Sequence, residues 1–312
     1  MIENLPRRRS VAKGRRRQRV FTWVRLRRLV QVLSLLLFLY LLLATKRGGV
    51  TYLPHDTFFR LDPLAASSSM MAGRRWIAPL ALGLSIPILA LLLGRFWCGW
   101  LCPLGTLIDW TRLRRRPRRD ERDLPPAWRG LRHAVLLTIL LAALLGNLTL
   151  LFLDPVTLVF RSVTVAVLPP LAALVGRIDE ALYGIGPLQG TAEQFDSIAR
   201  RGLPLDQPVV WQAAIALAAM ILSVFALNAV RTRFWCRYVC PLGAGLGLVS
   251  KIAWLRQSVD SAACSSCALC AGACPTGAIS ERRGFVADPA ECTLCMNCLQ
   301  ACHRGRSAFT VT

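Results

Sequence analysis

Four apolar runs, each of about twenty residues, most strongly limit how this chain can fold. They cover roughly residues 29–45, 77–97, 133–153 and 209–230. A helix needs roughly 20 apolar residues to cross the hydrocarbon core of a bilayer, so each run predicts a transmembrane helix. None has an acidic or basic residue near its centre, so each can cross without burying a charge.

The distribution of Lys and Arg predicts the orientation in the membrane. Residues 1–28 hold eleven of these basic residues and residues 112–132 hold nine, whereas residues 46–76 hold five and residues 154–208 hold four. Cytoplasmic loops are the basic ones. We therefore expect a multi-pass protein of the inner (cytoplasmic) membrane, with residues 1–28 as a basic cytoplasmic N-terminus. The net charge of +22 does not indicate nucleic-acid binding, because the arginines cluster at the ends of apolar runs.

A fifth apolar stretch, residues 156–175, is ambiguous. It is long enough to cross but contains Arg161 and the pair Pro169–Pro170. A further crossing here would place the two thiol motifs described below on opposite faces of the membrane. We therefore expect an interfacial or half-inserted helix on the outer side, followed by an outer loop over residues 184–208.

Eight of the twelve cysteines form two runs with the spacing C-x2-C-x2-C-x3-C near the C-terminus. This is the spacing of bacterial two-cluster ferredoxins, in which the fourth cysteine of each run ligates the other cluster. Zinc also binds C-x2-C pairs, but it needs only four ligands and suits these runs less well. We expect two [4Fe–4S] clusters in a cytoplasmic domain over residues 259–312, the first held by Cys264, Cys267, Cys270 and Cys302, the second by Cys292, Cys295, Cys298 and Cys274.

The other four cysteines lie in a repeated motif. RFWCGWLCPLG begins at Arg95 and RFWCRYVCPLG begins at Arg233, with eight of eleven positions identical. The prolines that follow the second cysteines disfavour helix at Cys102 and Cys240, so each helix should end near there and the glycine should let the chain turn. We expect Trp97 and Trp235 to anchor at the membrane interface and Arg95 and Arg233 to face lipid headgroups.

The repeated cysteines are Cys98, Cys102, Cys236 and Cys240. Both copies follow an apolar run, so the copies can pack as a parallel repeat with four sulfurs close together. Buried cysteine also packs as a small apolar side chain, which is the alternative for any single pair. Two near-identical copies favour a redox or metal role, either as two dithiols or as one four-thiolate site.

Two C-x3-C-P motifs after membrane spans, followed by a two-cluster ferredoxin module, resemble the NapH/NosR-type membrane iron–sulfur proteins over residues 77–302. The resemblance implies a quinol dehydrogenase-type subunit that takes electrons from the quinone pool and passes them to a partner reductase, cytochrome or ferredoxin subunit. The chain is also similar to CcoG-type factors, which implies copper handling during assembly of a respiratory enzyme as an alternative.

The expected fold is a membrane all-α bundle with about four transmembrane helices over residues 29–258, followed by a small α+β two-cluster ferredoxin-like domain. The expected function is electron transfer, with copper handling or redox sensing as alternatives. Only three histidines occur, none paired within the spans, so an intramembrane haem is not indicated. There is no G-x-G-x-x-G dinucleotide motif, and no acid–base pair stands out in the sequence.

Overall fold

A computed structural model of the 312-residue chain describes residues 5–47, 53–111, 126–183 and 211–311. Side chains of the basic N-terminal segment up to residue 22 are outside this description, as are the basic loop 112–125 and the expected outer loop at 184–208.

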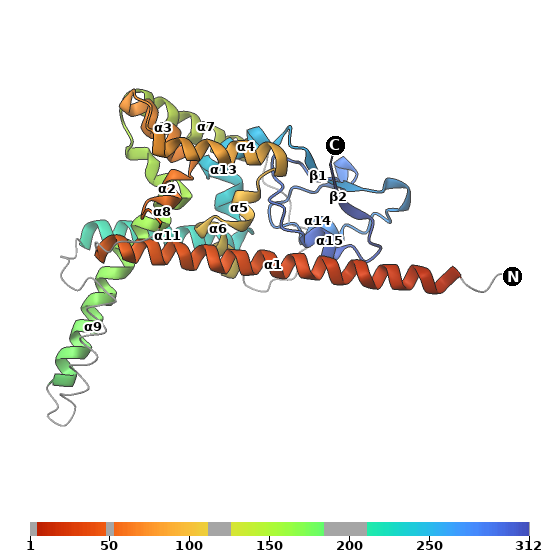
Figure 1. The fold of residues 1–312 in the computed structure, drawn as a ribbon, viewed down its shortest axis with the longest axis horizontal. Coiled ribbons are helices and arrows are strands. Elements are labelled where there is room, and N and C mark those ends of the chain that lie inside the picture. Colours follow the sequence, from red (N-terminus) through yellow and green to blue (C-terminus); the bar gives the residue numbers. More distant parts are fainter. Residues whose placement is uncertain (1–4, 48–52, 112–125, 184–210, 312) are drawn as a thin grey trace.

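The described helices form two layers with short helices between them (Figure 1). One layer contains α1 (Leu5–Arg47) and α11 (Trp211–Val230), and the other contains α3 (Pro63–Gly73), α4 (Ser85–Leu93) and α7 (Pro126–Leu144). The short helices between the layers are α2 (Thr57–Arg60), α5 (Phe96–Trp100), α6 (Pro103–Trp110), α8 (Pro155–Arg161), α12 (Phe234–Tyr238) and α13 (Pro241–Ser250).

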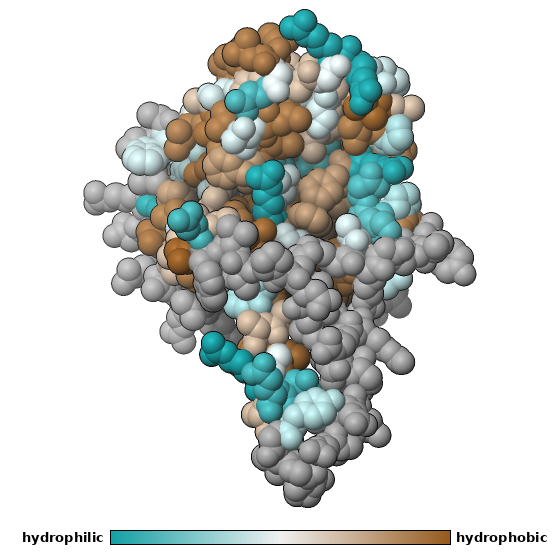
Figure 2. Space-filling model, turned by 90° about the vertical axis from the view of Figure 1, so that its left-hand side faces the viewer, coloured by the Kyte–Doolittle hydropathy of each residue, from teal (hydrophilic) through white to brown (hydrophobic). Residues whose placement is uncertain are grey.

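The outer faces of the long helices are apolar. Leu33, Leu137 and Ile215 are 55%, 58% and 64% exposed, although each lies in the middle of an apolar helix. Figure 2 shows the end of the molecule away from the C-terminal domain, where hydrophobic residues cover much of the described surface. Apolar surface of this extent is what a bundle surrounded by lipid presents. The chain is a membrane protein.

The expected spans correspond to helices, with differences at their ends. Three described helical segments are long and apolar enough to cross: Trp23–Thr45, Pro155–Tyr183 and Gln212–Val230. The expected run at 77–97 forms a shorter helix over Ala78–Leu93, which ends at Gly94 with φ of 73°. The expected run at 133–153 divides at Gly146, because α7 ends before this glycine and a 3-10 turn follows at Thr149–Leu153.

The ambiguous fifth stretch is helical throughout. α8, a π-helical turn at Ser162–Val167 and α9 (Leu168–Tyr183) form one continuous segment that includes Pro169 and Pro170. α9 leaves the bundle at the end away from the C-terminal domain and extends across the direction of α1 (Figure 1).

The C-terminal domain is small and closed by a two-stranded sheet. β1 (Leu255–Val259) pairs antiparallel with β2 (Ser307–Val311), with Leu255 opposite Val311. Between the strands lie α14 (Leu269–Ala273) and α15 (Asn297–Ala301), which pack against each other. The domain lies beside the N-terminal half of α1, which contacts α15 (Figure 1). The prediction of a helical membrane bundle with a small C-terminal α+β domain is confirmed at this level.

Candidate functional site

The two C-x3-C-P motifs have the same local structure and lie in one core. In each copy an apolar helix, α4 or α11, is followed by a five-residue helix and then by a helix that begins at the proline. All four cysteines are buried, and they belong to one cluster of packed apolar residues. They are Cys98, Cys102, Cys236 and Cys240.

The second cysteine of each motif caps the following helix. Cys102 Sγ accepts a hydrogen bond from Gly105 N at 3.5 Å, and Cys240 Sγ accepts one from Gly243 N at 3.3 Å. The proline then occupies the first helical position, where its missing N–H costs nothing. The preceding helices end at Trp100 and Tyr238, two residues before the capping cysteine, close to the predicted end.

The glycines of the motif permit close packing and do not form a turn, so the expectation of a turn is wrong. Both lie inside the first turn of a helix. A Cβ at Gly105 would come within 2.8 Å of the Cys98 carbonyl oxygen, and one at Gly243 within 2.6 Å of Arg95 Nη2. Only glycine leaves room for these neighbours.

The expected surface roles of four motif residues are also wrong. Arg95 and Arg233 are each 1% exposed, and Trp97 and Trp235 are 1% and 6% exposed. The tryptophans fill the core between the two motifs. The arginines are buried because each has a carboxylate partner far away in sequence, which the local pattern could not indicate.

Arg95 joins the first motif to the C-terminal domain. Its Nη1 donates to the Ala290 carbonyl oxygen at 2.9 Å and lies 3.3 Å from Glu291 Oε2. Arg132 of α7 donates to both oxygens of Glu291, at 2.9 and 2.5 Å. Glu291 immediately precedes Cys292, so this buried network holds the second cysteine run against the bundle. Arg95 lies within electrostatic range of Cys98, Cys236 and Cys240.

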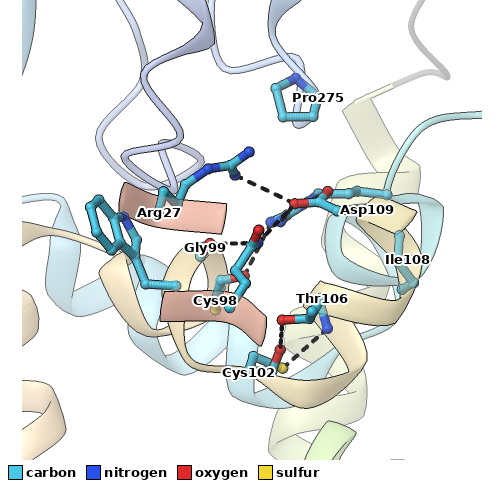
Figure 3. Close-up of polar contacts among 12 residues, drawn as sticks. Arg27, Cys98, Gly99, Cys102, Thr106, Ile108, Asp109 and Pro275 are labelled. Atoms are coloured by element: carbon cyan, nitrogen blue, oxygen red, sulfur yellow. Dashed lines mark hydrogen bonds and ion pairs between the residues drawn. The ribbon is translucent and has the colours of Figure 1, made fainter. Parts of the chain in front are cut away.

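Arg233 joins the second motif to the first. Its Nε and Nη2 donate to the two oxygens of Asp109 at 2.9 and 2.7 Å, and its Nη1 donates to the Cys98 carbonyl oxygen at 3.2 Å. Arg27 of α1 lies 3.4 Å from Asp109 Oδ2 (Figure 3), and Gln31 Nε2 donates to the same oxygen at 3.1 Å. Burial opposes ionisation of this carboxyl, but the Arg233 guanidinium holds its pKa down at about 2. The closest contacts of each motif arginine are therefore with residues outside its own copy of the motif.

The C-terminal domain contacts the first motif directly. The backbone of Gly99 lies so close to the Thr293 carbonyl oxygen that no side chain fits between them. Trp100 Nε1 donates to the Leu294 carbonyl oxygen at 3.2 Å. Thr293 and Leu294 lie between Cys292 and Cys295, so the loop of the second cysteine run packs on the C-x3-C-P loop.

The structure brings four of the eight C-terminal cysteines together around one cavity. One cavity is lined by Cys274, Cys292, Cys295 and Cys298, so the fourth cysteine of the first run joins three from the second. Cys302 lies within electrostatic range of Cys270, as does Cys264. Cys267 is partly buried in the same loop.

The two runs share a backbone geometry suited to a cluster. Ser266 and Leu294 have φ of 49° and 51°, and Ala268 and Met296 have φ of 57° and 62°. Non-glycine residues rarely adopt this conformation, and the same two positions adopt it in both runs. Alternating left- and right-handed residues turn N–H groups into one concavity, as at many iron–sulfur sites.

Hydrogen bonds to sulfur repeat in the same way. Ala278 N donates to Cys274 Sγ and Arg306 N donates to Cys302 Sγ, both at 3.3 Å. Each of these donors follows its cysteine by four residues, so the two runs are also equivalent here. Cavity, backbone and donors together fit [4Fe–4S] clusters in the C-terminal domain.

Burial disfavours free thiolates in the C-x3-C-P motifs. It raises the pKa of Cys236 to about 11 and the pKa values of Cys102 and Cys240 well above the usual range. Free thiol chemistry and metal ligation both need the thiolate, so burial disfavours both unless a nearby positive charge compensates. Among the described residues, no group of three or more His, Cys, Asp or Glu is arranged to hold a single metal ion.

Four buried or mostly buried acidic residues are further candidate functional residues that the sequence motifs do not indicate. The carboxylates Asp109 and Glu291 neutralise the buried motif arginines, and two further carboxylates, Asp62 and Asp154, are completely buried. The sequence did offer a signal for the last two, because each precedes a proline at the start of an apolar helix. The sequence does not indicate that Asp62 and Asp154, which are 92 residues apart, lie close to each other in the fold.

The buried cysteine motifs at the base of the helical bundle and the cluster-type loops packed on them define a membrane-bound iron–sulfur electron-transfer protein. A family model described as "4Fe-4S binding domain" matches residues 76–119 and 211–260, the two C-x3-C-P regions. A second model with the same description matches residues 258–280, which include the first cysteine run.

Curated relatives are similar to larger parts of the chain than the family models match. The ferredoxin-type protein NapH of Escherichia coli is 26% identical over 93% of this chain and 89% of its own length. The methylamine utilization ferredoxin-type protein MauN of Methylorubrum extorquens is 27% identical over 82% of this chain and 76% of its own. The regulatory protein NosR of Pseudomonas aeruginosa is 27% identical over 68% of this chain and 24% of its own.

These matches confirm the resemblance predicted from the cysteine motifs: the chain is similar to NapH/NosR-type iron–sulfur proteins and contains 4Fe-4S binding domains. No solved structure matches it.

Proposed function

We propose that this protein is a quinol dehydrogenase-type subunit that takes electrons from membrane quinol and passes them to a partner reductase, cytochrome or ferredoxin subunit. Two [4Fe–4S] clusters in the C-terminal domain would each accept and release one electron. The observation that carries the proposal is the direct contact between the second cysteine run and the C-x3-C-P motif at Gly99 and Thr293. This contact gives electrons a short route from the membrane bundle into the C-terminal domain.

The contacts also support a topology. Both C-x3-C-P motifs pack on one C-terminal domain, so the chain must cross the membrane an even number of times between them. α7 and α11 supply two crossings, and α9 extends across the direction of α1 (Figure 1). We infer four crossings, at α1, Ala78–Leu93, α7 and α11, with residues 155–183 as an interfacial helix on the outer side. The basic N-terminus and the C-terminal domain then face the cytoplasm.

The proposal is tested by anaerobic titration of the purified protein with a quinol, followed by electron paramagnetic resonance. Reduced cluster signals should develop as quinol is added. If quinol does not change these signals at any ratio of quinol to quinone, the protein is not a quinol dehydrogenase. Dithionite, a small-molecule reductant, provides the control that the clusters are present and reducible.

The cluster ligands can be tested by metal content. Two clusters correspond to about eight iron atoms per chain, and Cys274→Ser should lower this to about four. Combining Cys274→Ser with Cys292→Ser should lose no more iron, because both residues are assigned to one cluster. Combining Cys274→Ser with Cys264→Ser should remove nearly all the iron. If the two double variants lose equal amounts of iron, the crossed assignment is wrong.

Copper handling is the second candidate, because four buried sulfurs from two motifs gather in one core beside two arginines. Metal analysis separates the alternatives. Iron near eight per chain without copper favours electron transfer through the C-terminal clusters alone, and about four further iron atoms indicate a third cluster at the motifs. Stoichiometric copper that is lost in Cys98→Ser and Cys236→Ser favours metal handling.

The same two variants test whether the motif cysteines carry electrons. Cys98→Ser and Cys236→Ser should each slow reduction of the C-terminal clusters by quinol at least tenfold, while dithionite still reduces them. Serine is close to cysteine in size, so packing should be little changed. If the rate of cluster reduction by quinol is unaltered, these cysteines serve only as small buried side chains in the core.

A further inference from the structure

Asp62 and Asp154 are buried carboxyl groups that begin two helices. Both side chains are completely buried. Asp62 Oδ1 accepts hydrogen bonds from Leu64 N and Ala65 N, at 2.8 and 3.2 Å, and caps α3. Asp154 Oδ2 accepts hydrogen bonds from the first two N–H groups of α8 that follow Pro155, at 2.9 and 3.1 Å. One oxygen of each carboxyl group is thereby occupied.

The remaining oxygen of each carboxyl group receives no hydrogen bond from the described residues. Asp62 Oδ2 and Asp154 Oδ1 are buried, and neither has an N–H or O–H partner among the described residues. The two carboxyl groups lie within hydrogen-bonding reach of each other. Two ionised carboxylates repel each other, so this contact is stable only when a proton lies between them. Burial raises the pKa of Asp62, and burial together with Asp62 raises the pKa of Asp154.

The described residues supply no strong basic counter-charge to the pair. Among the described residues, none of the groups that act most strongly on either carboxyl is an arginine or lysine. Thr157 Oγ1, in the turn capped by Asp154, is also buried without a partner. Serine, threonine or asparagine would cap these helices equally well without a buried ionisable group. Capping alone therefore does not account for two acids, and ionisable groups inside membrane bundles mark functional sites.

The position of the pair relates it to the redox site. Asp154 lies within electrostatic range of Cys102, and α8 packs on α6, the helix that Cys102 caps. Figure 1 shows α2 and α8 on the side of α5 and α6 away from the C-terminal domain. The C-terminal domain contacts the opposite side of the motif, at Gly99. The carboxyl pair and the second cysteine run therefore lie on opposite sides of the C-x3-C-P core.

We propose that Asp62 and Asp154 share one proton and are the proton acceptor for hydroquinone oxidation in this protein. This inference rests on the proposed function and adds the residues that receive the protons. Oxidation of a hydroquinone to a quinone breaks two O–H bonds and releases two electrons and two protons. The electrons leave one at a time toward the C-terminal domain. With each electron, the singly protonated pair takes up one proton and returns it to water before the next.

Infrared spectroscopy tests the shared proton without any turnover. The C=O stretch of a protonated carboxyl group is separate from carboxylate bands and shifts in D2O. The wild-type protein should show this band, and Asp62→Asn and Asp154→Asn should each lose it. Asparagine can still cap the helix and donates a hydrogen bond to the facing carboxylate, so both variants should fold. Asp56→Asn, six residues before Asp62 at the exposed start of α2, is the matched control. A wild-type spectrum without the band overturns the shared proton.

Quinol-driven reduction tests the acceptor role. In the Asp62→Asn and Asp154→Asn variants, quinol should reduce the clusters roughly a hundredfold more slowly than in wild type. A positioned acid–base group accelerates a proton transfer by about that factor or more. Reduction by dithionite and iron content should be unchanged, and Asp56→Asn should match wild type. If both variants keep the wild-type quinol rate, the pair is only a structural tie between α3 and α8.

The two proposals fail in different ways. If quinol reduces the wild-type clusters and the Asn variants equally fast, the acceptor role fails and the proposed function stands. If quinol does not reduce the wild-type clusters, both the acceptor role and the proposed function fail. The infrared band then still decides whether Asp62 and Asp154 share a proton.

Discussion

In the Gly99→Ala variant, quinol is expected to reduce the C-terminal clusters at least tenfold more slowly than in the wild-type protein. An alanine Cβ would overlap the Thr293 carbonyl oxygen, which is backbone and cannot move aside as a flexible side chain can. The loop of the second cysteine run must therefore move away from the C-x3-C-P motif. A displacement of about 1 Å can cost a hundredfold in the rate of a step that depends on position.

Gly130→Ala is the matched control for this prediction. Gly130 lies in α7, and a Cβ there would meet no atom within 4 Å. Alanine in a helix interior is favoured over glycine by about 1 kcal/mol, so this variant should transfer electrons normally and be slightly more stable. Stopped-flow reduction by quinol, with dithionite as the control reductant, measures both variants. If the Gly99→Ala variant is reduced as fast as wild type, electron transfer to the clusters does not depend on this contact.

The Glu291→Gln variant is expected to lose roughly 3–5 kcal/mol of stability in the contact between the C-terminal domain and the bundle. Glu291 is 4% exposed and neutralises Arg95 and Arg132, whose side chains are 1% and 5% exposed. Glutamine has the same shape but no charge, so two buried guanidinium groups remain without a counter-ion. The second cysteine run, which begins at the next residue, should then release its iron to a chelator faster.

An exposed ion pair provides the control. Arg306 and Asp260 lie 3.4 Å apart with side chains 51% and 48% exposed, and exposed pairs contribute at most about 1 kcal/mol. Asp260→Asn should leave the thermal unfolding temperature and the rate of iron release nearly unchanged. The two variants remove one carboxylate each from the same domain. Equal, small effects in both would mean that the Glu291 network does not hold the domain in place.

The patterns that repeat in the sequence predicted most of the arrangement. The two C-x2-C-x2-C-x3-C runs predicted which cysteines gather in one cavity, including Cys274 with the second run. The C-x3-C-P copies predicted two equivalent helix ends. Such features succeed because the physical cause, ligand spacing or a proline, lies within a few residues.

The errors concern residues whose partners are distant in the chain. Arg95 and Arg233 resemble interfacial arginines until Glu291 and Asp109, 196 and 124 residues away, are placed beside them. Gly105 resembles a turn residue until the Cys98 carbonyl oxygen is seen against it. Asp62 and Asp154 resemble ordinary helix caps, because nothing in the local sequence shows that the two carboxyl groups interact. Tertiary packing decides each of these roles.

The crossed contacts of the two motif arginines have a consequence for how such a fold can arise. Arg95 lies against Gly243 of the second copy, and Arg233 donates to the Cys98 carbonyl oxygen of the first. A polypeptide with a single copy could neutralise and enclose its arginine only by associating with another molecule. Joining two copies in one chain replaces that association, which depends on concentration, with a permanent one. Either half expressed alone should therefore aggregate or form pairs.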